Sequence, residues 1–320
     1  MCRNIRSTTA LLLVCAAFLT ACSHVNHLRE AQDSFNRAAE TDNLYRFGSA
    51  DGPDLNTGKS ATDALSATAG YAATIAVIEE LKQDREASSK LQDDGLYGYA
   101  LVLQSLAYWR LGKWEESVAV SREAQDSGDL GPRDLALMQA LPGLIKNNQA
   151  HARLKAEKNT MACAVSESDG ASKWDVELGG GTVLNLHCSP GVIEVRDQLG
   201  GALCNVEDAR TKSPPGHSVR DYLALTQLAT IANTRDLCDS ARYSGAPAKF
   251  SSACVDETIR LGGCLAGDPY QDDPDALINA IVNDFCRGRV LEQKTLVWDL
   301  VNKSGIDSSQ ILEACPEPAQ

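Results

Sequence analysis

The cysteines of this chain are confined to its two ends, and this distribution limits what each part can fold into. Three lie within the first 22 residues, none occurs from 23 to 162, and eight follow in the second half. Even numbers of cysteines in an exported chain are typical of disulfides, although the pairing stays open. No two are spaced like the C-x₂₋₄-C ligand pairs of structural zinc sites, and no C-x-x-C redox motif occurs. The sequence therefore predicts disulfides rather than metal ligands at Cys163, Cys188, Cys204, Cys238, Cys254, Cys264, Cys286 and Cys315.

The amino terminus has the pattern of an export signal. Arg3 and Arg6 precede an apolar stretch, residues 10–18, which is far shorter than the roughly 20 residues that span a bilayer. The next four residues resemble the lipobox of bacterial lipoproteins: Leu19-Thr20-Ala21-Cys22. An ordinary cleaved signal peptide with an incidental cysteine is the alternative interpretation.

The lipobox resemblance implies a processed and acylated amino terminus. In that family the segment before the cysteine is removed, and the thiol and the new amino group of Cys22 become acylated. Several acyl chains anchor a protein firmly, whereas one chain binds marginally. In that family an Asp after the acylated cysteine implies retention in the inner membrane. This chain has Ser23 at that position, so the resemblance implies anchoring in the outer membrane, with the protein facing the periplasm. Residues 1–21 are then a signal peptide, and 22–27 are a lipidated anchor and linker.

The charge of the chain argues against a nucleic-acid partner. Acidic residues number 43 against 30 basic ones, for a formal net charge of −13 at pH 7. Such a surface repels phosphate backbones. The negative charge is explained by solubility alone, or it indicates a basic protein or a cation as partner.

The cysteine-free part, residues 28–158, is rich in alanine and has the apolar period of amphipathic helices. The stretch 43–59 contains glycines, a proline and polar residues that indicate a loop. Pro142 predicts a kink or a break in the last helix. The expected helices are Leu28–Ala39, Thr62–Arg85, Gly98–Leu111, Trp114–Ser127 and Pro132–Lys158.

A spacing of 43 residues relates Leu28, Tyr71 and Trp114, and large and small residues alternate after each of them. Residues 28–158 resemble tetratricopeptide repeats through Ala31-x₃-Phe35 and through Leu101, Tyr108, Gly112, Trp114 and Ala124. Gln104, Ser105 and Ser121 depart from that family's pattern, and a generic helical bundle is the alternative. The resemblance implies a concave groove for a protein partner. The residues expected to line it are Tyr97, Leu101, Tyr108 and Trp109.

The second half, residues 159–320, is predicted to be a mostly helical, disulfide-tied domain with a small β-hairpin. Apolar and polar residues alternate on both sides of a three-glycine turn, in 174–178 and 182–187, which is typical of a hairpin. Helices are expected at 219–238, 251–261, from 274 onward, 295–302 and 308–314. The fold class is thus mainly α, with a helical-repeat module followed by this domain.

No catalytic motif is present in the sequence. The nucleophile elbow, the zinc-protease helix and the phosphate-binding loop are all missing, and we expect no enzyme activity, no cofactor and no metal. The expected function is that of an adaptor or scaffold lipoprotein that binds an envelope protein. A transporter-associated ligand-binding lipoprotein and an envelope hydrolase are the alternatives.

Overall fold

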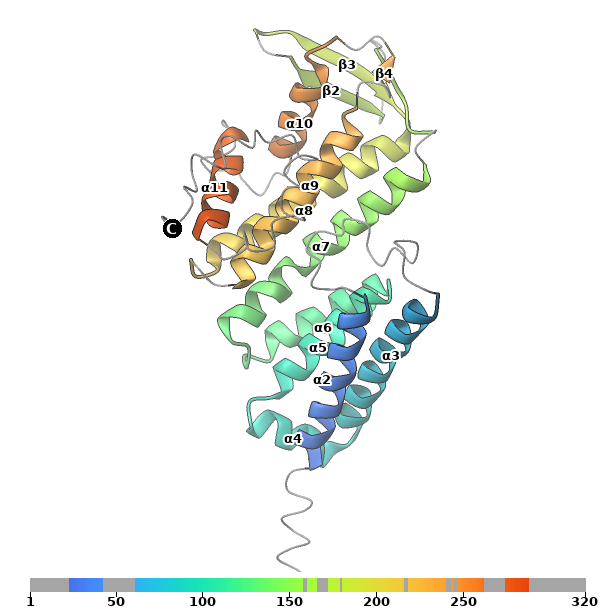
Figure 1. Ribbon diagram of the computed structural model, residues 1–320. Coiled ribbons are helices and arrows are strands. Elements are labelled where there is room, and N and C mark those ends of the chain that lie inside the picture. Colours follow the sequence, from blue (N-terminus) through green and yellow to red (C-terminus); the bar gives the residue numbers. More distant parts are fainter. Residues whose placement is uncertain are drawn as a thin grey trace, which may run out of the picture. The chain divides into compact units, whose positions relative to one another are not determined.

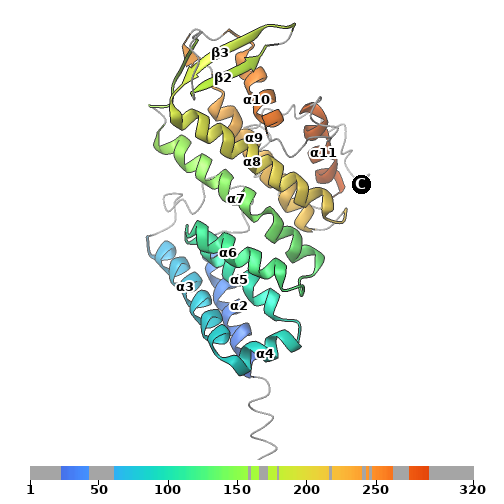
Figure 2. The same ribbon diagram turned by 180° about the vertical axis from the view of Figure 1, so that it is seen from behind.

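The computed structural model describes residues 23–42, 61–157, 160–165, 172–178, 180–215, 218–239, 243–244, 247–261 and 274–287. Its fold is mainly helical with one small sheet and disulfides, which confirms the predicted fold class (Figures 1 and 2). The chain divides into two compact units. Among the described residues, unit 1 contains 23–42 and 61–134, and unit 2 begins at Leu135. Residues 1–22 lie outside the described residues, as do the helices expected at 295–302 and 308–314.

Unit 1 is a bundle of helices whose ends agree with the prediction within a few residues, with two exceptions. The helices are α2 (Ser23–Asp42), α3 (Ala61–Gln83), α4 (Arg85–Asp93), α5 (Tyr97–Arg110) and α6 (Trp114–Asp126). Helix α4 was not predicted; Asp84 caps it by accepting hydrogen bonds from the backbone N–H groups of Glu86 and Ala87, at 2.9 and 3.2 Å. The prediction of a linker is wrong for residues 23–27, because α2 already begins at Ser23.

Helices α2 and α3 form an antiparallel pair. The Thr74 hydroxyl donates to the Ala31 carbonyl at 3.2 Å, and the rings of Phe35 and Tyr71 lie 5.4 Å apart, edge to face. Residue numbers rise along one helix as they fall along the other. Corresponding helices of successive repeats run in the same direction, so the 43-residue spacing does not relate α2 to α3 as repeats.

Helices α5 and α6 form a second pair around a tight turn. Gly112 in this turn has φ +70°, a backbone conformation that suits glycine. Ser105 and Ser117 are buried where the helices cross, and each hydroxyl donates to the other residue's carbonyl at 2.9 Å. Ser105, which departs from the repeat pattern, thus satisfies its polar group within the crossing.

Unit 2 contains α7 (Pro132–Ala156), α8 (Pro190–Lys212), α9 (Ser218–Leu237), α10 (Phe250–Leu261) and α11 (Pro274–Arg287). Helix α8 was not predicted. From Leu135 onward α7 belongs to unit 2, whereas the sequence placed it in the helical module. Its buried Ala150 and Leu154 share the core of this unit with residues of α8 and α9, which explains the assignment.

Helix α7 runs through Pro142 without a break, so the proline does not split it. The proline removes one backbone donor. Burial of Leu141 and Leu144 beside it holds the helix in place. The next residue, Gly143, meets α8: a Cβ at this position would lie 2.9 Å from the Ala202 carbonyl oxygen. Only a residue without a side chain permits this close crossing.

The sheet has the strand order β2-β3-β1-β4, made of β1 (Cys163–Val165), β2 (Lys173–Glu177), β3 (Val183–Cys188) and β4 (Tyr243–Ser244). Strands β2 and β3 form the predicted antiparallel hairpin, with Trp174 opposite Leu186. Both of these side chains are buried, so their face of the hairpin packs on the core of unit 2. Strands β1 and β4 were not predicted, because each is too short to show alternation.

The disulfides lie in unit 2, as expected. Cys163 pairs with Cys188 across β1 and β3, with a Cα–Cα distance of 4.0 Å, and Cys238 at the end of α9 pairs with Cys254 of α10 at 5.7 Å. Cys204 is also disulfide-bonded. The side chains of Cys264, Cys286 and Cys315 lie outside the described residues.

Candidate functional sites

Three of the four residues predicted to line a partner groove are buried. Leu101 is 0% exposed, Trp109 6% and Tyr108 8%. Tyr108 belongs to the hydrophobic core that α2, α3 and α5 share. The groove prediction is therefore wrong for these three, because apolar residues at helical spacing were assigned to a surface when they form a core. Tyr97 alone is half-buried.

Tyr97 joins a polar cluster on α3, α5 and α6, which we call the Tyr97 cluster: Tyr97, Glu123 and Lys82. The Tyr97 hydroxyl donates to Glu123 Oε1 at 2.7 Å, and Lys82 Nζ lies 2.8 Å from Glu123 Oε2. Burial and the hydrogen bond to Glu123 raise the pKa of Tyr97 to about 12. Burial acts to raise the pKa of Glu123, but the hydrogen bonds from Lys82 and Tyr97 outweigh it and lower this pKa. The carboxylate is thus held charged and in place at the half-buried edge of the bundle.

A second tyrosine–carboxylate pair joins α5 to α3. The Tyr108 hydroxyl donates to Glu79 Oε1 at 2.6 Å, and Lys113 Nζ lies 5.6 Å from the centre of the Tyr108 ring. Burial and the bond to Glu79 raise the pKa of Tyr108 to about 12. Both phenols are therefore neutral donors at physiological pH, and they fix acidic side chains rather than act as bases.

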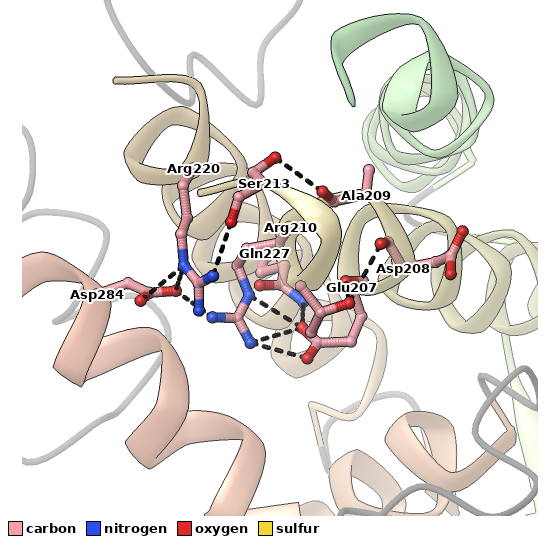
Figure 3. A network of polar contacts seen from close by, with 9 residues as sticks. Glu207, Asp208, Ala209, Arg210, Ser213, Arg220, Gln227 and Asp284 are labelled. Carbon is pink, nitrogen blue, oxygen red and sulfur yellow. Dashed lines mark hydrogen bonds and ion pairs between the residues drawn. The ribbon is translucent and has the colours of Figure 1, made fainter. Parts of the chain in front are cut away.

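Unit 2 contains a buried charge network that joins α8, α9 and α11 (Figure 3). Arg210, whose side chain is 1% exposed, donates to both carboxylate oxygens of Glu207, at 2.8 Å, and to Asp284. Arg220 Nε lies 2.9 Å from both oxygens of Asp284. Gln227 Nε2 donates to Glu207 Oε2 at 2.7 Å. Two arginines and two carboxylates thus form one hydrogen-bonded group from three helices.

This network has structural rather than catalytic chemistry. Burial acts to lower the pKa of Arg210, but the charges of Glu207 and Asp284 outweigh it and raise this pKa. Every charged group in the network faces an opposite charge, so no proton is poised for transfer. Its evident effect is to hold α11 against the α8–α9 pair.

The described residues line two cavities that bear on function. One, of about 540 Å³, lies in unit 2 beside the start of α8, where Ile193 and Pro190 meet Lys146, Glu194 and Asp197. The other, of about 210 Å³, lies in unit 1 beside the start of α2, between His27 and the acidic side chains of Glu80 and Asp84. The first combines apolar and charged walls, and the second is mainly polar.

Within the part of the chain that the structure describes, no three His, Cys, Asp or Glu side chains are placed to hold a metal ion. No helix in these described residues is long and apolar enough to cross a membrane.

Sequence reasoning missed the buried network entirely. Its one local signal is the i, i+3 spacing of Glu207 and Arg210, which ordinarily indicates an exposed ion pair. Asp284, which completes the network, lies 74 residues after Arg210. Comparison with protein families, with curated proteins and with solved structures finds no match for this chain.

Proposed function

We propose that this protein is a lipid-anchored adaptor of the bacterial envelope, facing the periplasm from the outer membrane, which binds a protein partner through unit 1. The observation that carries the proposal is the sequence Leu19-Thr20-Ala21-Cys22 immediately before a folded helical bundle. Acylation of Cys22 would place this bundle at a membrane surface. The charged groups of the network in unit 2 are paired with one another, which suits a structural role.

The partner surface that we propose is the Tyr97 cluster, since the other predicted groove residues are buried. Tyr97 offers a half-buried aromatic ring, a residue type enriched in binding hot spots. Lys82 and Glu123, which have side-chain exposures of 25% and 41%, add fixed charges at its edge. A pre-ordered aromatic side chain beside a held ion pair loses little side-chain entropy when a partner binds.

The test is crosslinking in cells followed by mass spectrometry of captured proteins. Wild-type protein should capture one dominant envelope protein, and Tyr97→Ala should lose it while retaining the helical circular dichroism of the wild type. Tyr97→Phe, which keeps the ring, should retain most of the capture. Equal capture by wild type and Tyr97→Ala would exclude this surface, and absence of any partner above background would contradict the adaptor function.

The cavity in unit 2 favours a second candidate, ligand binding for a transporter. About 540 Å³ lies within the usual size range of small-molecule sites, and its walls combine Ile193 and Pro190 with Lys146. Native mass spectrometry of protein purified from the envelope should then detect a bound small molecule. Its release by Ile193→Trp, which adds bulk to one wall of the cavity, would support this function, whereas a measured mass equal to that of the protein alone would count against it.

A further inference from the structure

Helix α2 begins one residue after the cysteine that we propose to be acylated, and its first turn is already packed into unit 1. His24 is 4% exposed, and its Nε2 lies 2.7 Å from Asp94 Oδ2, at the end of α4. Leu28, one turn further along, is 5% exposed and belongs to the core of the unit. Ser23 therefore directly follows the anchoring cysteine, and the packed part of α2 begins with the next residue, His24.

The covalent geometry leaves almost no slack between anchor and bundle. Consecutive Cα atoms lie about 3.8 Å apart, whereas the six-residue linker expected from the sequence would reach about 20 Å. The chemistry of an acylated amino terminus also suits a helix that begins here. Acylation turns the amino group into an amide, which removes a positive charge from the helix N-terminus. The amide carbonyl can also take the place of the Ala21 carbonyl as acceptor for the N–H of Val25.

The surface next to the start of α2 is formed by the end of α3 and by α4. The cavity beside Ser23 is walled by His27, by Glu80 and Asp84 near the end of α3, and by Glu86 and Lys90 of α4. Both views of the fold place α4 at the same end of unit 1 as the start of α2 (Figures 1 and 2). The opposite end of the α2–α3 pair, where α3 begins, lies about 30 Å away, because α2 has 20 residues.

We propose that the end of unit 1 formed by Ser23, the last turns of α3 and helix α4 rests on the membrane surface, and that unit 1 stands on the bilayer in one fixed orientation without a flexible linker. This inference rests on the acylation of Cys22 in the proposed function, and it adds which face meets the lipid.

The charges at this end select the kind of lipid surface. Acidic residues outnumber basic ones here: Glu80, Asp84, Glu86, Asp93 and Asp94 against Arg85 and Lys90. Within a Debye length of about 8 Å, such a surface is repelled by anionic headgroups. The ammonium group of phosphatidylethanolamine can instead donate hydrogen bonds to these carboxylates. The matching partner is therefore a zwitterionic surface rich in phosphatidylethanolamine.

The experiment uses the full lipidated protein in phosphatidylethanolamine-rich vesicles whose headgroups carry a nitroxide quencher. A fluorophore is attached to Ser89→Cys on α4 or to Ser66→Cys near the start of α3; both serines are exposed and helical. We expect severalfold stronger quenching at position 89 than at position 66. Adding phosphatidylglycerol should weaken the quenching at position 89, and salt should restore it.

A matched control inserts a Gly/Ser segment between Ser23 and His24, which leaves Cys22 and Ser23 intact. Ten such residues span roughly 17 Å, so the difference between the two positions should disappear. The mass of the amino-terminal peptide reports acylation separately. An unmodified Cys22 would overturn the anchor in the proposed function and this inference together. With Cys22 acylated and the protein in the vesicles, equal quenching at the two positions in the parent protein would overturn this inference alone.

Discussion

Replacing Asp284 with asparagine should cost more stability than any single surface change on unit 2. The carboxylate accepts hydrogen bonds from Arg210 and Arg220 and is 4% exposed. Asparagine keeps the shape but removes the charge, and its NH₂ group would face guanidinium donors. Arg210 would keep Glu207 as its partner, whereas Arg220, whose side chain is 16% exposed, would keep only the Ser213 carbonyl and would lose its opposite charge.

Removal of one partner of a buried ion pair typically lowers the free energy of unfolding by about 3–5 kcal/mol. Domains are stable by only about 5–15 kcal/mol, so this is a large share of the total. With a urea m-value of about 2 kcal/mol per M, the midpoint of unfolding should fall by about 1.5–2.5 M. The measurement is urea denaturation of the disulfide-intact protein, followed by circular dichroism.

Helix α8, which carries Glu207 and Arg210, offers a matched control. Lys212 and Asp208 form an ion pair at 2.7 Å, one turn apart on α8, with side-chain exposures of 57% and 55%. Because exposed pairs contribute little, Lys212→Ala should cost less than about 1 kcal/mol. If Asp284→Asn costs no more than this control, the network is solvated and our reasoning is refuted.

A third variant separates charge pairing from packing. The triple replacement Glu207→Leu, Arg210→Met and Asp284→Leu removes the three most buried charges together and leaves Arg220, which is 16% exposed and also donates to the Ser213 carbonyl. Buried ion groups replaced by apolar residues of similar volume are often neutral or stabilising. We therefore expect the triple variant to be more stable than Asp284→Asn, although it contains more changes. A triple variant as unstable as the sum of its single changes would contradict this.

Three further results are expected. Gly143→Ala should destabilise unit 2 by about 1–3 kcal/mol, because the new methyl group would lie 2.9 Å from the Ala202 carbonyl oxygen on α8; urea denaturation measures this. Loss of the disulfide that closes 16 residues, by Cys238→Ser with Cys254→Ser, should cost about 3 kcal/mol in thermal or urea unfolding. Unit 1 should lose stability as the pH rises from about 10 toward 12, since the pKa of Tyr97 is about 12 in the fold and 10.0 as a free side chain.

Each of these results has a control. Gly131→Ala should be nearly neutral, because nothing lies within 4 Å of a Cβ there, and an equal cost at both glycines would contradict the close crossing. Reduction of the disulfides should leave the helical circular dichroism of unit 1 intact. Loss of that signal would show that unit 1 also depends on the disulfides of unit 2. Tyr97→Phe should reduce the alkaline decline of stability and leave the share of Tyr108, whose pKa is also raised to about 12; an unchanged decline would assign the effect to other groups.

The elements that the sequence predicted well are those whose burial pattern is regular and local. The hairpin around the glycine turn is confirmed because alternation of Trp174 and Val176 with charged residues reports directly on which face is buried. Helices α9, α10 and α11 were found because their apolar residues recur every three or four positions. Helix α8 was missed because Gly200 and Gly201 interrupt its pattern, and the structure shows that α8 still packs along α9.

The predicted groove shows where a single sequence misleads. Leu101, Tyr108 and Trp109 recur at helical spacing, which marks a face of α5 but does not say what covers it. Only the position of α2 and α3 decides that Tyr108 lies in a core. The charge network was missed for the same reason. Glu207 and Arg210 are far from Asp284 in the sequence, and no local pattern connects them.

The sequence by itself determined the mainly helical fold class, the hairpin and the disulfide-tied half, because periodicity and cysteine content act locally or through composition. Tertiary structure alone decided which helices pair, where α7 belongs, that α2 begins next to Cys22, and which charges are buried. The physical reason is that burial depends on what packs against a residue. Periodicity names the apolar face of a helix, but only the neighbouring helix determines whether that face, and any charge on it, leaves water.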